Sequence, residues 1–136
     1  MIVIVIVGIL SAVALPSFLN QTVKAKATEC TTKFGAMLSQ IAAEAQISTG
    51  DADTLAAALV SSGDTNSAIC DFAITPLGAT PSSTIYTGSV TGKGELDGKY
   101  LAKGCVNYVN SKRTLKSATS NTSDAPTIKD EDIVCT

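Results

Sequence analysis

Four cysteines are the residues whose type and spacing most directly indicate chemistry: Cys30, Cys70, Cys105 and Cys135. No pair has CxxC spacing, so the pattern does not favour a zinc ribbon or a thioredoxin-type redox site. An even number of cysteines behind a strongly apolar start favours disulfides formed in an oxidising compartment. Three connectivities are possible. Cys30–Cys70 with Cys105–Cys135 is favoured because each bond closes a moderate loop within one half of the chain, and four buried free thiols are the alternative.

No combination of side chains indicates catalysis. The chain contains no histidine, which removes His-based acid–base catalysis and His metal ligands together. Its carboxylates form no paired arrangement, and no nucleophile motif such as GxSxG is present. The formal net charge of −2 provides no general basic field for nucleic acid. We therefore expect a protein that is not an enzyme and has no cofactor, metal or small-molecule substrate.

Two polar clusters near the C-terminus are weaker candidates for sites. Asp130-Glu131-Asp132, with Asp124 nearby, could bind calcium, but the spacing matches no known calcium loop and favours a solvated acidic turn. Asn121 begins an Asn-Thr-Ser sequon and is a candidate glycosylation site, although such matches are common in a Ser/Thr-rich sequence.

The first fifteen residues, MIVIVIVGILSAVAL, are all apolar or small, and the first charged side chain is Lys24. Three interpretations are open. Ala12-Val13-Ala14 resembles a signal-peptide cleavage site, but the usual preceding basic region is missing. As a membrane anchor, fifteen helical residues would span only about 22 Å, less than a hydrocarbon core of roughly 30 Å. Because the segment is apolar on all sides, it could also form the core of a filament by packing against identical segments.

Beyond Pro16 the pattern changes to that of an amphipathic helix. Residues 1–47 predict one helix of about 70 Å, kinked at Pro16 and weakened at Gly8. Lys24, Lys26 and Lys33 lie largely off its apolar stripe; a solvated face is favoured over contacts with anionic lipid or acidic groups of a neighbour. The stripe recurs every three or four residues: Leu19, Val23, Ala27, Cys30, Phe34, Met37, Leu38, Ile41 and Ala45.

The remainder predicts a small sheet packed on that stripe. Residues 48–83 are expected to be a connecting loop with a short helix at 53–61, capped by Asp51 or Asp53. Residues 84–118 predict an antiparallel meander of about three strands, and 119–136 a polar tail held by a Cys135 disulfide. The three strand-like runs are 84–90, 99–110 and 113–118.

These elements predict a single α+β domain. Its long N-terminal helix would have an apolar half, residues 1–16, and an amphipathic half, residues 17–47. The amphipathic half would pack on the small antiparallel sheet, because a helix stripe and one sheet face can bury each other. The chain is long enough for one such domain and too short for two.

The block MIVIVIVGILSAVALPSFLNQTVKAKATE resembles the N-terminal segment of type IV pilins. The matching features are Gly8, the small residues at 11–14, Leu15-Pro16, and the Lys-Ala pattern at 24–27. The resemblance is to type IVa-like major pilins and, in layout, to the cyanobacterial type. In that family a methylated aromatic residue starts the mature chain and a glutamate follows shortly after. Neither has a counterpart here, so we expect this sequence to begin inside the family's segment.

The resemblance implies a pilin-like fold and a structural role. The precursor would wait in the inner membrane until pilus assembly machinery extracts it into a helical homopolymer on the cell surface. Such a filament would serve adhesion, twitching motility or DNA uptake, with surfaces or DNA as further partners. The alternatives are a minor pilin or type II secretion pseudopilin, and a secreted binding domain with a signal peptide. The residues expected to pack in the filament core are Ile2, Ile4, Ile6, Gly8, Ile9, Ser11, Ala12, Ala14, Leu15 and Pro16.

Overall fold

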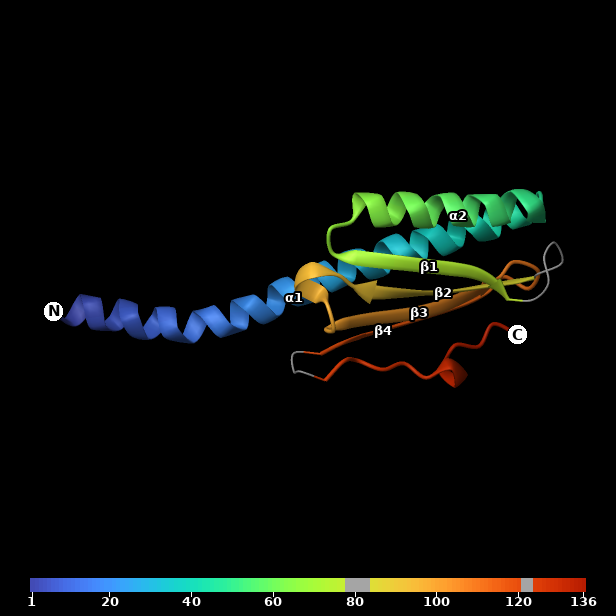
Figure 1. Ribbon diagram of the computed structural model, residues 1–136. Helices are drawn as coiled ribbons and strands as arrows, with labels where there is room; N and C mark the ends of the chain where they lie inside the picture. The colour runs from blue at the N-terminus through green and yellow to red at the C-terminus, as the bar shows by residue number, and fades with distance from the viewer. Residues whose placement is uncertain (78–83, 121–123) are drawn as a thin grey trace.

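In the computed structural model, the described residues form two α-helices and a four-stranded sheet (Figure 1). The structure describes residues 1–77, 84–120 and 124–136, and within these it does not describe the side chains of 15–17, 19 and 64–66. The helices are α1, Ile2–Ala45, and α2, Thr49–Asn66. The strands are β1, Cys70–Leu77; β2, Ile85–Gly92; β3, Tyr100–Asn107; and β4, Lys112–Thr119. Two short 3-10 turns complete the order: η1, Gly94–Leu96, and η2, Asp130–Asp132.

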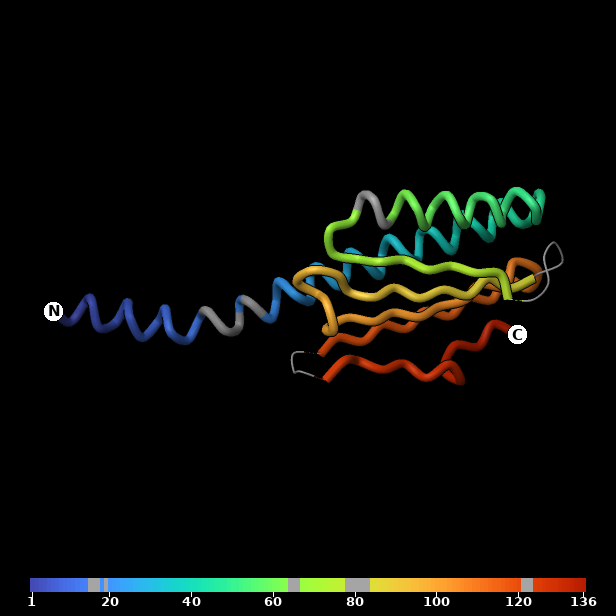
Figure 2. Tube along the Cα trace, in the orientation of Figure 1, coloured from blue at the N-terminus to red at the C-terminus, as the bar shows by residue number. Residues whose placement is uncertain are grey.

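The sheet is a simple antiparallel meander in the order β1-β2-β3-β4. The helices lie on one face of it, with α2 contacting β1 and α1 contacting β2, β3 and β4. The tail returns along β4, as Figure 2 shows, and ends near the β3–β4 turn. The α+β class and the antiparallel sheet expected from the sequence are therefore confirmed.

The core forms between the amphipathic half of α1 and the helix-facing side of the sheet. Phe34, Leu38 and Ile41 are fully buried on α1, and Tyr86 and Val90 are fully buried on β2. The stripe from Ala27 to Ala45 thus faces inward, as the period of 3.6 residues predicts. Since the chain has few aromatic residues, this core is built mainly from aliphatic side chains and alanine.

Phe34 occupies a site that two glycines create. Gly88 on β2 lies directly opposite Gly104 on β3, and both face α1. A Cβ at Gly88 would lie 2.8 Å from the Phe34 ring, and one at Gly104 would lie 3.1 Å from it. The paired glycines therefore leave a flat area on the sheet that receives the aromatic ring.

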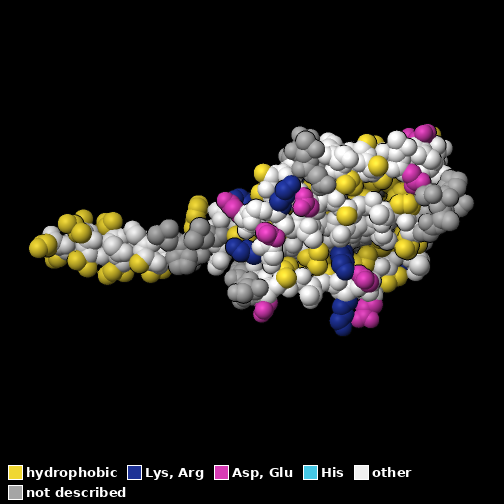
Figure 3. All heavy atoms as spheres, viewed as in Figure 1, with side chains coloured by type: hydrophobic (Ala, Val, Ile, Leu, Met, Phe, Trp, Pro, Cys, Tyr) yellow, Lys and Arg dark blue, Asp and Glu magenta, His cyan; other side chains and the backbone are white. Residues whose placement is uncertain are grey.

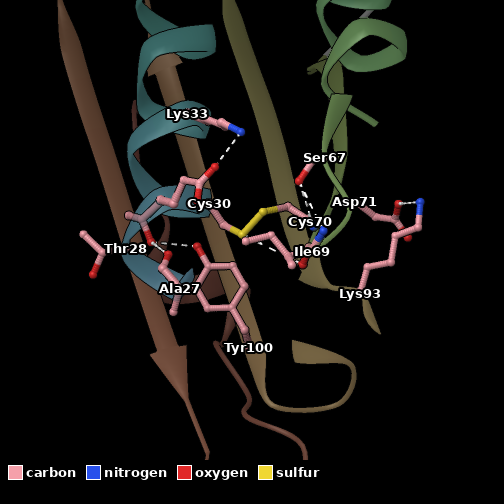
Figure 4. The surroundings of a disulfide bond; sticks show 12 residues. Ala27, Thr28, Cys30, Lys33, Ser67, Ile69, Cys70, Asp71, Lys93 and Tyr100 are labelled. Atoms are coloured by element: carbon pink, nitrogen blue, oxygen red, sulfur yellow. Dashed lines mark hydrogen bonds and ion pairs between the residues drawn. A yellow bond between two sulfur atoms is a disulfide. The ribbon is translucent and has the colours of Figure 1, made fainter. Parts of the chain in front are cut away.

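Two disulfides tie the elements together, with the connectivity that the loop lengths favoured. Cys30–Cys70 joins α1 to the start of β1 across a Cα–Cα distance of 5.9 Å (Figure 4). Beside it, the Cys70 backbone N–H donates to Ser67 Oγ at 3.0 Å, which fixes the entry into β1. Cys105–Cys135 joins β3 to the tail across 6.0 Å.

The described part of the connection, residues 48–77, is more regular than the loop with a short helix that the sequence predicted, so that prediction was wrong there; residues 78–83 lie outside the described residues. α2 has 18 residues rather than nine, and its N-cap is Ser48, whose Oγ accepts the Asp51 N–H at 3.4 Å. β1 replaces the expected loop and adds a fourth strand, burying the alternate residues Cys70, Phe72 and Ile74. β1 tolerates Pro76 because it is an edge strand, where one side of the backbone needs no ladder partner.

Candidate assembly surface

The described part of the apolar half of α1, residues 1–14, projects from the globular domain with its side chains uncovered (Figure 3). Ten large apolar residues, nine in this half and Phe18 just beyond it, have relative exposures between 51% and 77%. Burial of such a side chain is worth about 1.5–3 kcal/mol, so an apolar partner would stabilise this segment strongly. The ten are Ile2, Val3, Ile4, Val5, Ile6, Val7, Ile9, Leu10, Val13 and Phe18.

The segment has little polar surface to resist burial. Its backbone is helical, so most N–H and C=O groups bond within the helix. The hydroxyl of Ser11 donates to the Val7 carbonyl at 2.8 Å, which satisfies that polar group as well. Within the described residues, no helix combines the length and the hydropathy needed to cross a membrane.

Small residues make one side of the exposed half shallow. A Cβ added at Gly8 would meet nothing within 4 Å. Ala12 lies one turn later on the same face, because residues four apart stack along a helix, and Ser11 lies beside them. Small residues at this spacing let a second helix approach closely. Ala14 is exposed on another side of the helix.

Two of the predicted packing residues cannot be placed. The side chains of Leu15 and Pro16, and with them the expected effect of the proline on the helix, lie outside the described residues. The predicted isoleucines Ile2, Ile4, Ile6 and Ile9 point to several sides of α1, so they form a rod that is apolar all round.

The lysines of α1 differ in their surroundings at the point where the helix enters the globular domain. Lys26 forms an ion pair with Glu95 of η1, and Lys33 pairs with Glu29 at 2.7 Å. Among the described residues Lys24 has no ion-pair partner. Of the three lysines, Lys24 is therefore the one whose charge is available to a lipid headgroup or a neighbouring molecule.

The acidic turn near the C-terminus attaches the tail to the sheet. Asp130 pairs with Lys103 of β3 at 2.6 Å, and Asp132 pairs with Lys116 of β4 at 3.2 Å. In the described part of the chain, no group of three His, Cys, Asp or Glu side chains is arranged to hold a metal ion. Asn121, the candidate glycosylation site, falls within residues 121–123, which the structure does not describe.

Two buried tyrosines connect the helices to the sheet, a role that the sequence did not suggest. The Tyr86 hydroxyl donates to Asp53 Oδ1 of α2 at 2.7 Å. Burial, followed by this bond to a carboxylate, raises the pKa of Tyr86 well above its ordinary value. Tyr100 bonds Thr31 of α1 at 2.7 Å, and burial raises its pKa while the Thr31 hydrogen bond acts in the opposite direction. Both interactions are structural.

Sequence reasoning also gave Arg113 no role. In the structure its Nη1 donates to Ser39 Oγ of α1 at 2.8 Å, on a flank where α1 and β4 form a groove. The two residues are 74 positions apart in the sequence, so no local sequence pattern could have indicated this contact.

Comparisons with protein-family models, with curated proteins and with solved structures found no match.

Proposed function

We propose that this chain is the structural subunit of a type IV pilus, a filament in which the apolar halves of α1 from many copies form the core. The observation that carries the proposal is the exposed apolar rod from Ile2 to Val13, continuous with a helix whose second half is buried in the domain. Such a rod has no favourable state in water, and a bundle of identical rods would bury every side of it.

The same surface would suit a precursor in the inner membrane and a subunit in the filament. In both surroundings the apolar side chains remain out of water, so the exchange from lipid to protein is nearly neutral in hydrophobic free energy. Packing at Gly8, Ser11 and Ala12, together with work from the assembly machinery, would then decide the direction of transfer. The disulfides agree with an extracellular location for the globular domain.

A different function is favoured by one feature of the core. Among the side chains that the structure describes, Val23 is the first that packs against the core, so cleavage after Ala14 would leave the described core intact. A secreted binding domain with a removed signal peptide is therefore the second candidate. A minor pilin or type II secretion pseudopilin is a third, and it would use the same apolar half of α1.

Electron microscopy of filaments sheared from cells that produce this chain, with mass spectrometry of the major protein, separates these functions. Long filaments made of the chain with residues 1–14 retained would support the pilin. Protein found only in the membrane fraction would contradict a major pilin in favour of a minor pilin or pseudopilin. Soluble protein cut after Ala14 would overturn the assembly role altogether.

A further inference from the structure

β4 leaves one long edge of the sheet without a backbone partner. Its eight residues pair with β3 in unbroken register, from Lys112 opposite Asn107 to Thr119 opposite Tyr100. β4 is the last strand of the sheet, and in the described part of the chain no backbone hydrogen bond joins it to the tail. Every second N–H and C=O group of β4 therefore points away from β3 and has no partner in the sheet.

The described tail, residues 124–136, binds to a face of the sheet and not to this edge. Four side chains of β3 and β4 hold the tail, and they form two cross-strand pairs: Lys103 with Lys116, and Cys105 with Thr114. Between these pairs lies Gly104 opposite Leu115, and this pair faces α1. Because neighbouring residues of a strand point to opposite faces, the tail lies on the face away from the helices.

The features that protect edge strands are weaker on β4 than on β1, the other edge of the sheet. β1 contains Pro76, whose nitrogen cannot donate to a further strand. β4 contains neither proline nor glycine. Its two lysines, which could repel other chains, are engaged: Lys112 donates to the Thr136 carbonyl at 2.7 Å, and Lys116 pairs with Asp132. β4 is therefore the edge better suited to pair with a further strand.

A groove lies beside β4 on the side of the helices. It is bordered by α1 and β4 and has a volume of about 540 Å³. Arg113 and Leu115 line it from β4, and Thr28, Thr32 and Ser39 line it from α1. A strand added next to β4 would point every second side chain toward this groove, because side chains alternate between the faces of a sheet. The new strand would thus pack against α1 as well as pair with the edge.

Arg113 gives the groove a preference for negative charge. Its guanidinium donates to Ser39 Oγ at 2.8 Å and forms no ion pair with the described residues. A Cβ at Gly35 would lie 2.6 Å from Nη2, so the glycine leaves room for the guanidinium. None of the described side chains that line the groove is acidic. Since a guanidinium can bind both oxygens of a carboxylate, a strand with an acidic residue beside Arg113 fits best.

We propose that β4 and the groove beside it bind an extended segment of a partner protein, which adds a fifth strand to the sheet and places a carboxylate on Arg113. The open edge decides the class of partner, because only an extended polypeptide supplies N–H and C=O groups at the spacing of a strand. This contact goes beyond the proposed function. It does not use the apolar rod of α1, so its test does not depend on whether the chain forms filaments.

Titration of the isotope-labelled full chain in detergent micelles with a model peptide tests the edge. The peptide alternates threonine and valine around one central glutamate and is blocked at both ends. We expect NMR shift changes centred on β4, and hydrogen exchange of its edge-facing amides slowed by at least about threefold when the peptide is saturating. The control is the same peptide with methylated backbone nitrogens, which should bind at least about tenfold more weakly because it lacks the N–H donors.

The role of the arginine is tested by changing each charge separately and then both together. Arg113→Gln, or glutamine in place of the peptide's glutamate, should weaken binding at low salt by about three- to tenfold, and the combination should add no further loss. The matched control is Lys93→Gln, which removes a positive charge that pairs with Asp71 of β1, at the opposite side of the sheet, and should leave binding unchanged.

The methylated peptide leaves the protein unaltered, so a folding defect cannot mimic its effect. Equal binding of the methylated peptide, shifts centred on β1 or on the tail, or no shift with millimolar peptide would overturn strand addition at β4. If the losses from the two charge changes were additive, the carboxylate contact with Arg113 would be overturned. None of these results would alter the filament proposal, which electron microscopy tests separately.

Discussion

The smallest feature with a large effect on stability is the pair Gly88 and Gly104. Their missing side chains make room for the buried ring of Phe34. We expect Gly88→Ala and Gly104→Ala each to lower the free energy of unfolding by about 1–3 kcal/mol, because the added methyl group must displace the ring or the backbone. Urea unfolding of the full chain in mild detergent measures this change.

Gly50 provides the control for that pair. It lies in the first turn of α2, and a Cβ there would meet nothing within 4 Å. Gly50→Ala should be neutral or slightly stabilising, since alanine favours a helix. Equal effects at Gly50 and Gly88 would show that the space around Phe34 is not what makes Gly88 sensitive.

Tyr86 should make the stability of the domain depend on pH in the alkaline range. Its pKa is raised in the folded chain, so above its ordinary pKa near 10 the unfolded chain loses a proton that the folded chain keeps. The stabilisation is therefore complete below pH 10 and declines as the pH rises above it. We expect the unfolding free energy of Tyr86→Phe to fall less steeply between pH 9 and 11 than that of the wild type.

The same variant has a second expected effect at neutral pH. Without the hydroxyl, Asp53 loses its hydrogen bond, and the unfolding free energy should fall by about 1–2 kcal/mol. The lysines and the remaining tyrosines are the same in both proteins. Identical pH profiles of the unfolding free energy for Tyr86→Phe and the wild type would therefore contradict the assignment of the alkaline pH dependence to Tyr86.

Among the elements, the exposed half of α1 carries the prediction that bears most directly on assembly. Gly8→Leu or Ala12→Phe would fill the shallow face where a neighbouring helix is proposed to approach. We expect at least about a tenfold loss of sheared filaments, with unchanged thermal unfolding of the globular domain, since neither residue contacts its core. Ile9→Leu, which conserves volume at an exposed position, should assemble normally. Normal filament yield in Gly8→Leu would show that close helix approach at this face is unnecessary.

Helix and strand periodicity explain which elements could be predicted. The stripe from Ala27 to Ala45 and the runs that became β2, β3 and β4 repeat often enough to be recognised in the sequence. The start of α2 was placed too late because Ser48, Asp51 and Asp53 can all cap a helix, and only tertiary packing selects among them. β1 was missed because Pro76 suggested a loop, although Cys70, Phe72 and Ile74 alternate as a half-buried strand requires.

The two candidate surfaces also differ in how far the sequence could predict them. The apolar rod could be predicted because it is a local run of residues, whereas the groove at Arg113 forms only where β4 lies beside α1. The partner of Arg113 within the chain, Ser39, belongs to a segment that reads as ordinary amphipathic helix. Sites of this second kind require knowledge of the topology before they can be identified.

At the scale of the whole molecule, the two disulfides should contribute differently. Cys30–Cys70 lies in the core between α1 and β1, whereas Cys105–Cys135 holds the tail against the outer side of β3 and β4. We expect Cys105→Ser with Cys135→Ser to cost about 2–4 kcal/mol and to speed hydrogen exchange in the tail and β4, with α1 still protected. Hydrogen exchange with mass spectrometry measures both effects.

The matched comparison is the double variant Cys30→Ser with Cys70→Ser. It should speed hydrogen exchange throughout the core, because both sulfurs are buried between α1 and β1, which contribute residues to that core. Indistinguishable exchange patterns for the two pairs of variants would contradict the distinction between a bond of the core and a bond of the tail.

The position of Cys30 also determines how the molecule responds to pulling. Tension applied along the exposed rod enters the domain through α1 and reaches the Cys30–Cys70 bond before most of the core. The disulfide transmits the force directly from Cys30 to Cys70 at the start of β1. The chain between these two cysteines, a sequence separation of 40, therefore cannot be extended while the bond is intact. The second bond withholds a further loop with a separation of 30 in the same way. A domain unfolded by force would therefore lengthen far less than its number of residues suggests. Both disulfide-closed loops would stay compact, and refolding could start from them.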